Sequence, residues 1–509
     1  MLAHRSPWHR RLWNIGTCLS LREVVEYADT CIQGATTSSA GLHYVIETTR
    51  RETQRDPGVA HLSTQIDATF DRLKVKTKDV PRNACDELRH LAQRAEHEYL
   101  TQWMKSELHQ EVEFTARAIT SHLFDLGYSP DHLYRWHRAK SPQALSGLLE
   151  EASTMTTEMP QRDFEVFVPC SAPYEKPTGT NKVLRWLNGP EASTWIQRNT
   201  NAEKPRRYTG GILFTVDAKD PWAAIDQARS IATRADARIR VAQPTSQRLK
   251  LEETAYIAGL DNTYELKPTP LRIEIGSLYR QNAVYNFDNG LPTKTDDALL
   301  LASHMESANP GAAITSGWAA IEALLIRPDE DKHYQAADRL AALITCSLPR
   351  AELTHLAYQH KPDHPDTLSE QLETANNNYQ KIQLVEEHLK TGATLALTKP
   401  SDLAAQNRVQ EMINTPGETL KRVNRYITES LRRLYTQRNT ISHAGSLQSI
   451  TLNATTRTTF SLVGAGLDRI VHAQLNDAEL EPLALVARAE TELELLGTPG
   501  QRPLHQLLQ

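Results

Sequence analysis

This chain is organised around the stretch Leu420-Lys-Arg-Val-Asn-Arg-Tyr-Ile-Thr-Glu-Ser-Leu-Arg-Arg-Leu-Tyr-Thr-Gln-Arg-Asn-Thr-Ile-Ser-His-Ala-Gly445. Its apolar residues recur at helical spacing, which predicts one long amphipathic helix. They are Leu420, Val423, Ile427, Leu431 and Leu434. The next position on this stripe is Arg438, so we expect its guanidinium to point inward, where an unpaired charge is costly. Asn439 follows directly, and His443 lies five positions after the arginine.

An arginine followed five positions later by a histidine is a common spacing. The chain holds three such pairs, Arg117/His122, Arg350/His355 and Arg438/His443. Helical phase separates them. Arg117 lies opposite the apolar stripe of its own helix, which predicts a solvated surface arginine. Arg350 follows Pro349 in what reads as the first turn of a helix. Only Arg438 is in register with an apolar stripe.

The run Leu434–Gly445 resembles the signature of the HEPN superfamily, an arginine, a polar residue and then a histidine after four to six positions. The Asn after the arginine and the Ala-Gly after the histidine are closest to the Apea-like branch. A second run, Gly317–Leu325, resembles the first core helix of that branch and contains Glu322. The likeness is confined to the C-terminal part of the chain.

The resemblance implies a metal-independent ribonuclease that needs no cofactor and acts as a homodimer, with two motifs meeting at the interface. Arg438 would hold the scissile phosphate, His443 would transfer protons or polarise the hydroxyl, and Asn439 would orient them. Glu322 would support this pair from the neighbouring helix. These residue types suit the chemistry, because histidine can be base or acid at neutral pH and arginine binds phosphate bidentately.

Charge along the same helix agrees with an RNA partner. Between Glu418 and Arg438 there are six Lys or Arg residues against two Glu residues, in a chain whose net charge is −5. RNA binding therefore needs a local patch. The predicted contacts are Arg425, Arg432 and Arg433. The alternative is an ordinary solvated helix face.

Length and periodicity predict a mainly α protein with a central α/β insert. We expect a helical N-terminal domain over 1–158, a small α/β domain over 159–288 and a helical bundle over 289–509. Ser20-Leu-Arg-Glu23 has the pattern of a capping box and predicts a helix start.

The central segment is interpreted as a β-α-β unit. Phe164–Pro169 and Gly211–Val216 read as strands, and a helix is expected from Asp220 to Ala232, followed by a strand over Arg238–Ala242. Two later runs, Leu249–Ala258 and Leu271–Ile275, also suit strands. No phosphate-binding or dinucleotide fingerprint accompanies them, so the ligand of this segment stays open.

Composition points to a cytoplasmic protein without a membrane partner. Hydrophobic residues make up 39% and charged residues 23% of the chain, as in ordinary globular proteins. Five scattered cysteines without a Cys-x-x-Cys pair favour reduced thiols. No stretch of 18 uninterrupted apolar residues is present, and the basic N-terminus lacks the apolar run of a secretory signal.

Two rival functions remain open. One is metal binding by His355, His360, Asp363 and His364, which the spacing disfavours because residues five apart lie about 140° apart on a helix. The other is a non-catalytic HEPN-like protein that binds RNA or a nucleotide, or serves as a helical scaffold.

By family analogy, proteins of this layout resemble bacterial anti-phage or stress effectors that act as toxins in abortive infection. Residues 1–288 would hold the nuclease inactive until a phage product or nucleotide binds. The residues leave open which RNA is cut, what the trigger is and whether the oligomer exceeds a dimer.

Overall fold

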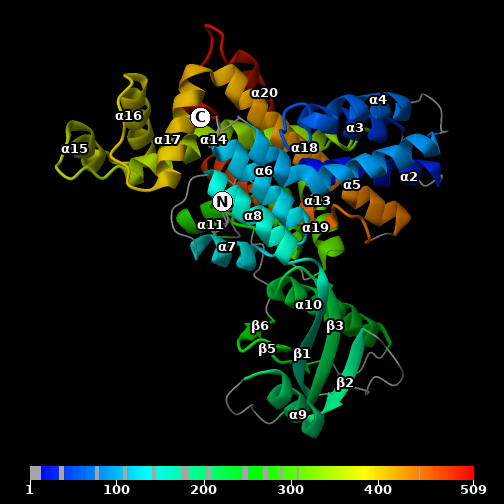
Figure 1. Ribbon diagram of the computed structural model, residues 1–509. Coiled ribbons are helices and arrows are strands. Elements are labelled where there is room, and N and C mark those ends of the chain that lie inside the picture. Colours follow the sequence, from blue (N-terminus) through cyan, green and yellow to red (C-terminus); the bar gives the residue numbers. More distant parts are fainter. Residues whose placement is uncertain are drawn as a thin grey trace.

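The computed structural model describes residues 13–33, 39–74, 80–106, 112–139, 145–172, 183–201, 208–242, 250–266, 273–286, 291–306, 309–445 and 447–509. The protein is mainly helical, with one small antiparallel sheet, as the sequence predicts. Figure 1 shows the sheet and its helices at one end of the molecule, below the packed helices of the N- and C-terminal segments. The domain boundaries at 158/159 and 288/289 stay a prediction.

The N-terminal segment forms a helical body around one hydrophobic cluster that includes Leu21, Ile46, Phe70, Leu88 and Tyr99. Its helices are α2 (Thr17–Ile32), α3 (Ser39–Thr53), α4 (Ser63–Leu73), α5 (Arg82–Lys105), α6 (Val112–Asp125), α7 (Pro130–Arg138) and α8 (Leu145–Glu158), with a 3-10 turn η1 (Ala60–Leu62).

The predicted helix start at Ser20–Glu23 is wrong. Helix α2 already begins at Thr17, after Gly16, and Glu23 lies in its buried second turn. Glu23 does not cap the helix because it lies inside it, and its carboxylate accepts from Arg433, 410 positions away. A sequence pattern typical of a helix cap can therefore lie in a helix interior, where its acidic residue forms a tertiary contact.

The sheet contains β1 (Arg162–Ala172), β2 (Leu184–Asn188), β3 (Gly210–Ala218), β4 (Lys250–Leu251), β5 (Thr254–Ile257) and β6 (Thr263–Glu265). Its order is β2-β3-β1-β5-β6, with β4 paired to β1, and each of these pairings is antiparallel. Helix α10 (Pro221–Ala242) packs through Ile225 and Ala228 against one side, and α9 (Gly189–Asn199) packs through Trp195 and Ile196 against the other.

The predicted β-α-β unit is therefore wrong. Residues Arg238–Ala242 form the last turns of α10 instead of a strand, because no helix breaker separates them from Ala232. Without that strand, β1 and β3 pair directly and antiparallel, from Arg162 opposite Ala218 to Pro169 opposite Gly211. The predicted strand Leu249–Ala258 is divided into β4 and β5, and Leu249 lies outside the described residues. Residues 273–275 of the last predicted strand have no strand structure, and Leu271 and Arg272 lie outside the described residues.

The C-terminal segment packs around a second large cluster, with Trp318, Leu340, Ile427 and Val463 buried inside it. Its elements are α11 (Gly276–Arg280), α12 (Thr293–Ser303), η2 (His304–Glu306), α13 (Pro310–Leu325), α14 (Gln335–Gln359), α15 (Thr367–Thr374), α16 (Asn378–Lys390), α17 (Pro400–Asn414), α18 (Pro416–Ala444), α19 (Leu452–Asn476), α20 (Pro482–Leu495) and η3 (Leu504–Gln506).

Helix α14 continues through Pro349, so the predicted helix start at Arg350 is wrong. A proline inside a helix costs about 3 kcal/mol or more, because it removes one hydrogen bond and crowds the preceding turn. Buried side chains on both sides of it, among them Ile344, Leu348 and Leu353, offset this cost.

Helix α18 is the element that both helical bodies share. Its predicted apolar stripe is confirmed, since Leu420, Ile427, Leu431 and Leu434 are all fully buried in the C-terminal core. Its other side is covered by the N-terminal body, and the Ser430 hydroxyl donates to the carbonyl of Trp13. In the described part of the chain, no helix is long and apolar enough to cross a membrane.

Candidate active site

Arg438 lies near the C-terminal end of α18, half-buried, with 27% of its side chain exposed. Its Nη1 donates to Oδ1 of Asn439 at 2.9 Å, and its Nη2 lies 3.3 Å from Oε2 of Glu322 on α13. The ion pair compensates a guanidinium that follows the apolar stripe. Two of its five donors are used by described residues, so others remain for a ligand.

Glu322 joins Arg438 to a second histidine. Its other carboxylate oxygen, Oε1, contacts Nδ1 of His333, which lies in the connection between α13 and α14. Sequence reasoning missed His333, because it follows Glu322 by eleven positions across a helix end and belongs to no motif. The two oxygens of one carboxylate thus hold an arginine and an imidazole in a fixed relation.

His443 occupies the last turn of α18, where its side chain is exposed. Gly445 then ends the helix in the left-handed conformation, with φ +63°, and its N–H donates to the carbonyl of Ile441 at 3.1 Å. Within the described residues, His443 has no hydrogen-bonding partner.

Arg438 and His443 of one chain do not face each other across a common point. They are five positions apart in the sequence, which places them about 140° apart around the helix and about 7.5 Å apart along its axis. The structure brings Arg438 together with Asn439, Glu322 and His333, but leaves His443 at the side of this group. A phosphate held by both residues of the motif would be served better by motifs from two copies.

The three arginines predicted to bind RNA each have another partner. Arg433 is buried and its Nε donates to both carboxylate oxygens of Glu23, at 2.9 and 3.1 Å. Arg432 pairs with Asp338 through Nε at 2.7 Å and Nη2 at 2.5 Å. Arg425 lies 4.0 Å from Glu429. The N-terminal body covers Arg433, whereas the partner of Arg432 belongs to α14 and Arg425 is partly exposed. The three arginines therefore do not form one open basic face.

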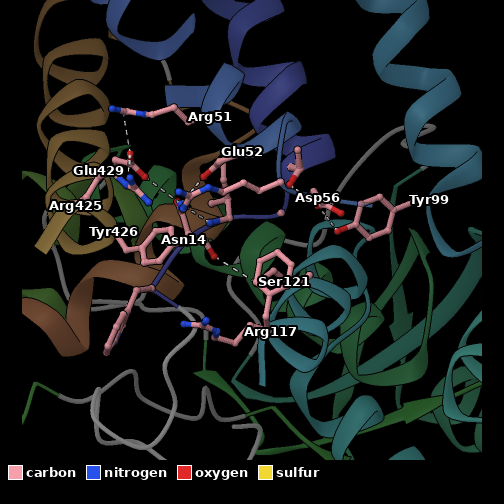
Figure 2. Close-up of a pocket in the computed structure, with 17 residues that line it drawn as sticks. Asn14, Arg51, Glu52, Asp56, Tyr99, Arg117, Ser121, Arg425, Tyr426 and Glu429 are labelled. Atoms are coloured by element: carbon pink, nitrogen blue, oxygen red, sulfur yellow. Dashed lines mark hydrogen bonds and ion pairs between the residues drawn. The ribbon is translucent and has the colours of Figure 1, made fainter. Parts of the chain in front are cut away.

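A cavity of about 100 Å³ lies between α3, α6, α18 and the segment before α2. Figure 2 shows Arg51 and Glu52 from α3 on one side, and Arg117 and Ser121 from α6 on another. Sequence reasoning missed this cavity, because its lining comes from five separate segments of the chain, including Tyr99 of α5. Arg117, predicted to be a solvated surface residue, is half-buried here.

The carboxylates of Glu52 and Glu429 are buried close together in the wall of this cavity. Burial and the neighbouring charge of Glu429 raise the pKa of Glu52 to about 8. Burial also raises the pKa of Glu429, against the lowering influence of Arg51 and Arg425. The Asn14 amide donates to Glu52 and, at 3.4 Å, to Glu429. The two acids therefore act as a pair that readily keeps a proton at neutral pH.

Two of the three histidines considered for metal binding contact a carboxylate instead, whereas His364 is exposed. His355 Nε2 is 3.0 Å from Asp402, and His360 Nε2 is 3.2 Å from Asp366. Nδ1 of His360 accepts from the N–H of Ala396 at 3.1 Å. Among the described residues, no group of three or more His, Cys, Asp or Glu side chains is placed to hold a metal ion.

Comparison with known proteins adds no relative. No protein-family model, curated protein or solved structure matches the chain.

Proposed function

We propose that this chain is a metal-independent endoribonuclease of the HEPN type that cuts RNA by transesterification. The observation that carries the proposal is the group at the end of α18, in which Asn439 and Glu322 orient the guanidinium of Arg438 and His443 stands exposed one turn further on. Arginine and histidine are the side chains that phosphodiester cleavage without a metal requires.

In the proposed reaction, the 2′-oxygen of the ribose attacks the neighbouring phosphorus while its proton passes to a neutral imidazole. The bond from phosphorus to the 5′-oxygen breaks, and the leaving oxygen takes a proton from a second, protonated imidazole. The products are a 2′,3′-cyclic phosphate and a 5′-hydroxyl. Arg438 stabilises the additional negative charge on the phosphate oxygens, an electrostatic contribution of roughly a hundred- to a thousandfold in rate.

The second imidazole is proposed to come from the His443 of another copy in a two-fold dimer. An isologous interface places the same residues opposite each other. The divergence of Arg438 and His443 around α18 supports this arrangement, because one chain supplies only one of the two imidazoles from its motif. His333 is a second source, held next to Arg438 through Glu322.

The test is cleavage of a mixed RNA substrate by the purified full-length protein and by Arg438→Ala and His443→Ala proteins. We expect each substitution to lower the rate at least a hundredfold while folding and dimerisation persist. A 2′,3′-cyclic phosphate at the new ends identifies the reaction. Unchanged cleavage by both variants refutes the proposal.

The second candidate function is RNA or nucleotide binding without cleavage. It is favoured by the ion pair of Arg438 with Glu322, because a carboxylate 3.3 Å from the guanidinium offsets the positive charge that cleavage requires. Binding of RNA with a steep dependence on salt, and no cleavage by any preparation, would support it.

The biological role we propose is that of a toxic effector in a bacterial anti-phage or stress response, acting in the cytoplasm. The layout supports this proposal, because the N-terminal body covers one side of α18 and could restrain it until a trigger binds. Infected cells that express the wild-type protein should stop growing and limit the phage, whereas an Arg438→Ala protein should give no protection. Equal protection by both proteins refutes the role.

A further inference from the structure

The cavity beside α18 carries an excess of positive charge. Its described lining contains four arginines, Arg51, Arg55, Arg117 and Arg425, and three carboxylates, Glu52, Asp56 and Glu429. Burial raises the pKa of all three carboxyl groups and most clearly favours the neutral form of Glu52, so at neutral pH the four guanidinium groups face at most two charged carboxylates. A dianion would balance this lining.

The two charged carboxylates are already engaged. Asp56 accepts hydrogen bonds from the hydroxyls of Thr17 and Tyr99, both at 2.6 Å, and from the N–H of Gly58 at 2.9 Å. Glu429 lies 3.1 Å from Arg51 and 4.0 Å from Arg425. Neither therefore neutralises the other arginines of the lining.

Arg55 and Arg117 are those other arginines. Within the described residues, neither forms an ion pair. Figure 2 shows Arg117 reaching from α6 toward the side of the cavity that Tyr426 of α18 forms. A guanidinium presents a planar pair of donors that matches phosphate geometry, so two unpaired arginines on one cavity indicate an anion site.

Aromatic side chains form the rest of the wall. The lining includes Trp13, Tyr99, Phe114 and Tyr426. Trp13 and Tyr99 are buried in the protein, whereas Phe114 and Tyr426 are half-exposed and offer ring surface to a ligand. The Arg425 guanidinium lies 5.3 Å from the centre of the Tyr426 ring. Planar rings stack favourably on such surfaces.

We propose that this cavity binds a small phosphorylated planar molecule of the nucleoside monophosphate class. The phosphate would lie against Arg55 and Arg117, and the base against Phe114 and Tyr426. A polar edge of the base would meet Glu52, whose buried Oε2 has no hydrogen-bond partner among the described residues.

The same site would control the end of α18. Arg425, Tyr426 and Glu429 of the cavity wall belong to this helix, and Arg438 follows Arg425 by thirteen residues, about 20 Å along the axis. A ligand that touches α3, α6 and α18 together changes how the N-terminal body holds the helix. This coupling rests on the proposed nuclease function, whereas ligand binding does not.

The binding test is calorimetry of the full-length protein with AMP, GMP, CMP and UMP, and with the nucleoside alone and ribose 5-phosphate alone. We expect at least one monophosphate to bind ten times or more tighter than either of its parts. Arg117→Ala should weaken that binding roughly ten- to a hundredfold, the effect of losing a charged hydrogen bond. Arg117→Lys should recover part of it.

The matched control is Arg422→Ala. Arg422 lies on α18 one turn before the cavity residues, pairs with Glu411 and does not line the cavity. Its loss should leave binding unchanged, and circular dichroism should show that all variants fold. No binding of any of the four monophosphates, or equal binding by the wild type and Arg117→Ala, refutes the site.

The proposed ligand site and the proposed nuclease function can be refuted independently of each other. The Arg438→Ala protein should still bind the monophosphate, since Arg438 is remote from the cavity. Binding without RNA cleavage by the wild type upholds the site and rejects the nuclease. Cleavage whose rate does not change when the cavity is saturated with the bound monophosphate rejects the coupling.

Discussion

Glu23 on α2 and Arg433 on α18 form a buried ion pair, with 5% of each side chain exposed and Nε of the arginine 2.9 Å from Oε1 of the glutamate. The pair joins the N-terminal body to the helix that carries the candidate site. Nη1 of Arg433 also donates to Oδ1 of Asn14 at 3.3 Å. Each charge relies on the other, because neither has access to water.

Removing one partner of this pair should strongly destabilise the protein. We expect Glu23→Ala to lower the free energy of unfolding by about 3–5 kcal/mol, because it leaves a buried guanidinium without its carboxylate. The double variant Glu23→Leu/Arg433→Met should recover most of that loss. Urea denaturation of the three proteins measures both effects, and an unchanged midpoint for Glu23→Ala would contradict the assigned role.

Glu322 should affect cleavage through Arg438 without being needed as an acid or base. Glu322→Gln keeps the shape of the side chain but removes the charge that holds the guanidinium and His333. We expect a fall of about ten- to a hundredfold in kcat, without a shift in the pH optimum. A displaced pH optimum would instead assign a proton-transfer role to Glu322. The measurement is a pH–rate profile of RNA cleavage.

His333→Ala separates the two possible sources of the second imidazole. If the second imidazole comes from the partner copy, the substitution should lower the rate less than tenfold, whereas His443→Ala should abolish cleavage. The control is a heterodimer of one wild-type chain and one His443→Ala chain. If the two imidazoles of the site come from the two copies, this heterodimer should be as inactive as the His443→Ala dimer. Half of the wild-type activity in the heterodimer would contradict the shared site.

Stability should depend on pH through Glu52. Its folded-state pKa of about 8 lies above the usual value of 4.5, so the native protein binds more protons than the unfolded chain between these values. Stability should therefore fall as pH rises from about 5 to 8. Glu52→Gln should flatten this part of the profile and be relatively more stable at pH 8. Thermal melts of both proteins over this pH range measure the effect. A wild-type stability that rises toward pH 8 would be inconsistent with a buried acid at position 52.

Gly445 should contribute to stability only through its backbone conformation. Its φ of +63° disfavours other residues, and a Cβ at this position would meet no atom within 4 Å. We expect Gly445→Ala to cost about 1 kcal/mol and Gly445→Asn less, because asparagine tolerates the left-handed region. Denaturation midpoints measure the difference. Equal midpoints for wild type and Gly445→Ala would show that the helix end relaxes freely.

The sequence predicted local features well and tertiary partners poorly. The stripe from Leu420 to Leu434 identified α18 and its buried side, because helical periodicity is a local property. The fate of Arg433 depended on Glu23, far away in the sequence, and periodicity carries no such information. The strand expected at Arg238–Ala242 failed for a related reason, since five residues of alternating character also fit a helix terminus.

The same reasoning predicted only part of the candidate site. Arg438, Asn439 and Glu322 lie together as expected of neighbouring helices, and their contacts are direct. His333 and the cavity beside α18 had no signal in the spacing of residues. Each is assembled from segments that meet only when the chain has folded.

Asp220 caps one helix and contacts the capping residue of another. The buried carboxylate of Asp220 accepts from the N–H of Ala223 at 2.9 Å at the start of α10, and from the N–H and hydroxyl of Ser129 at 2.7 and 2.8 Å. Ser129 in turn accepts from the N–H of His132 and caps α7. Excising the sheet together with Asp220 would leave Ser129, the capping residue of α7, without the carboxylate that accepts its N–H and hydroxyl. A truncated protein should therefore lose order at the start of α7 unless another acceptor replaces that carboxylate.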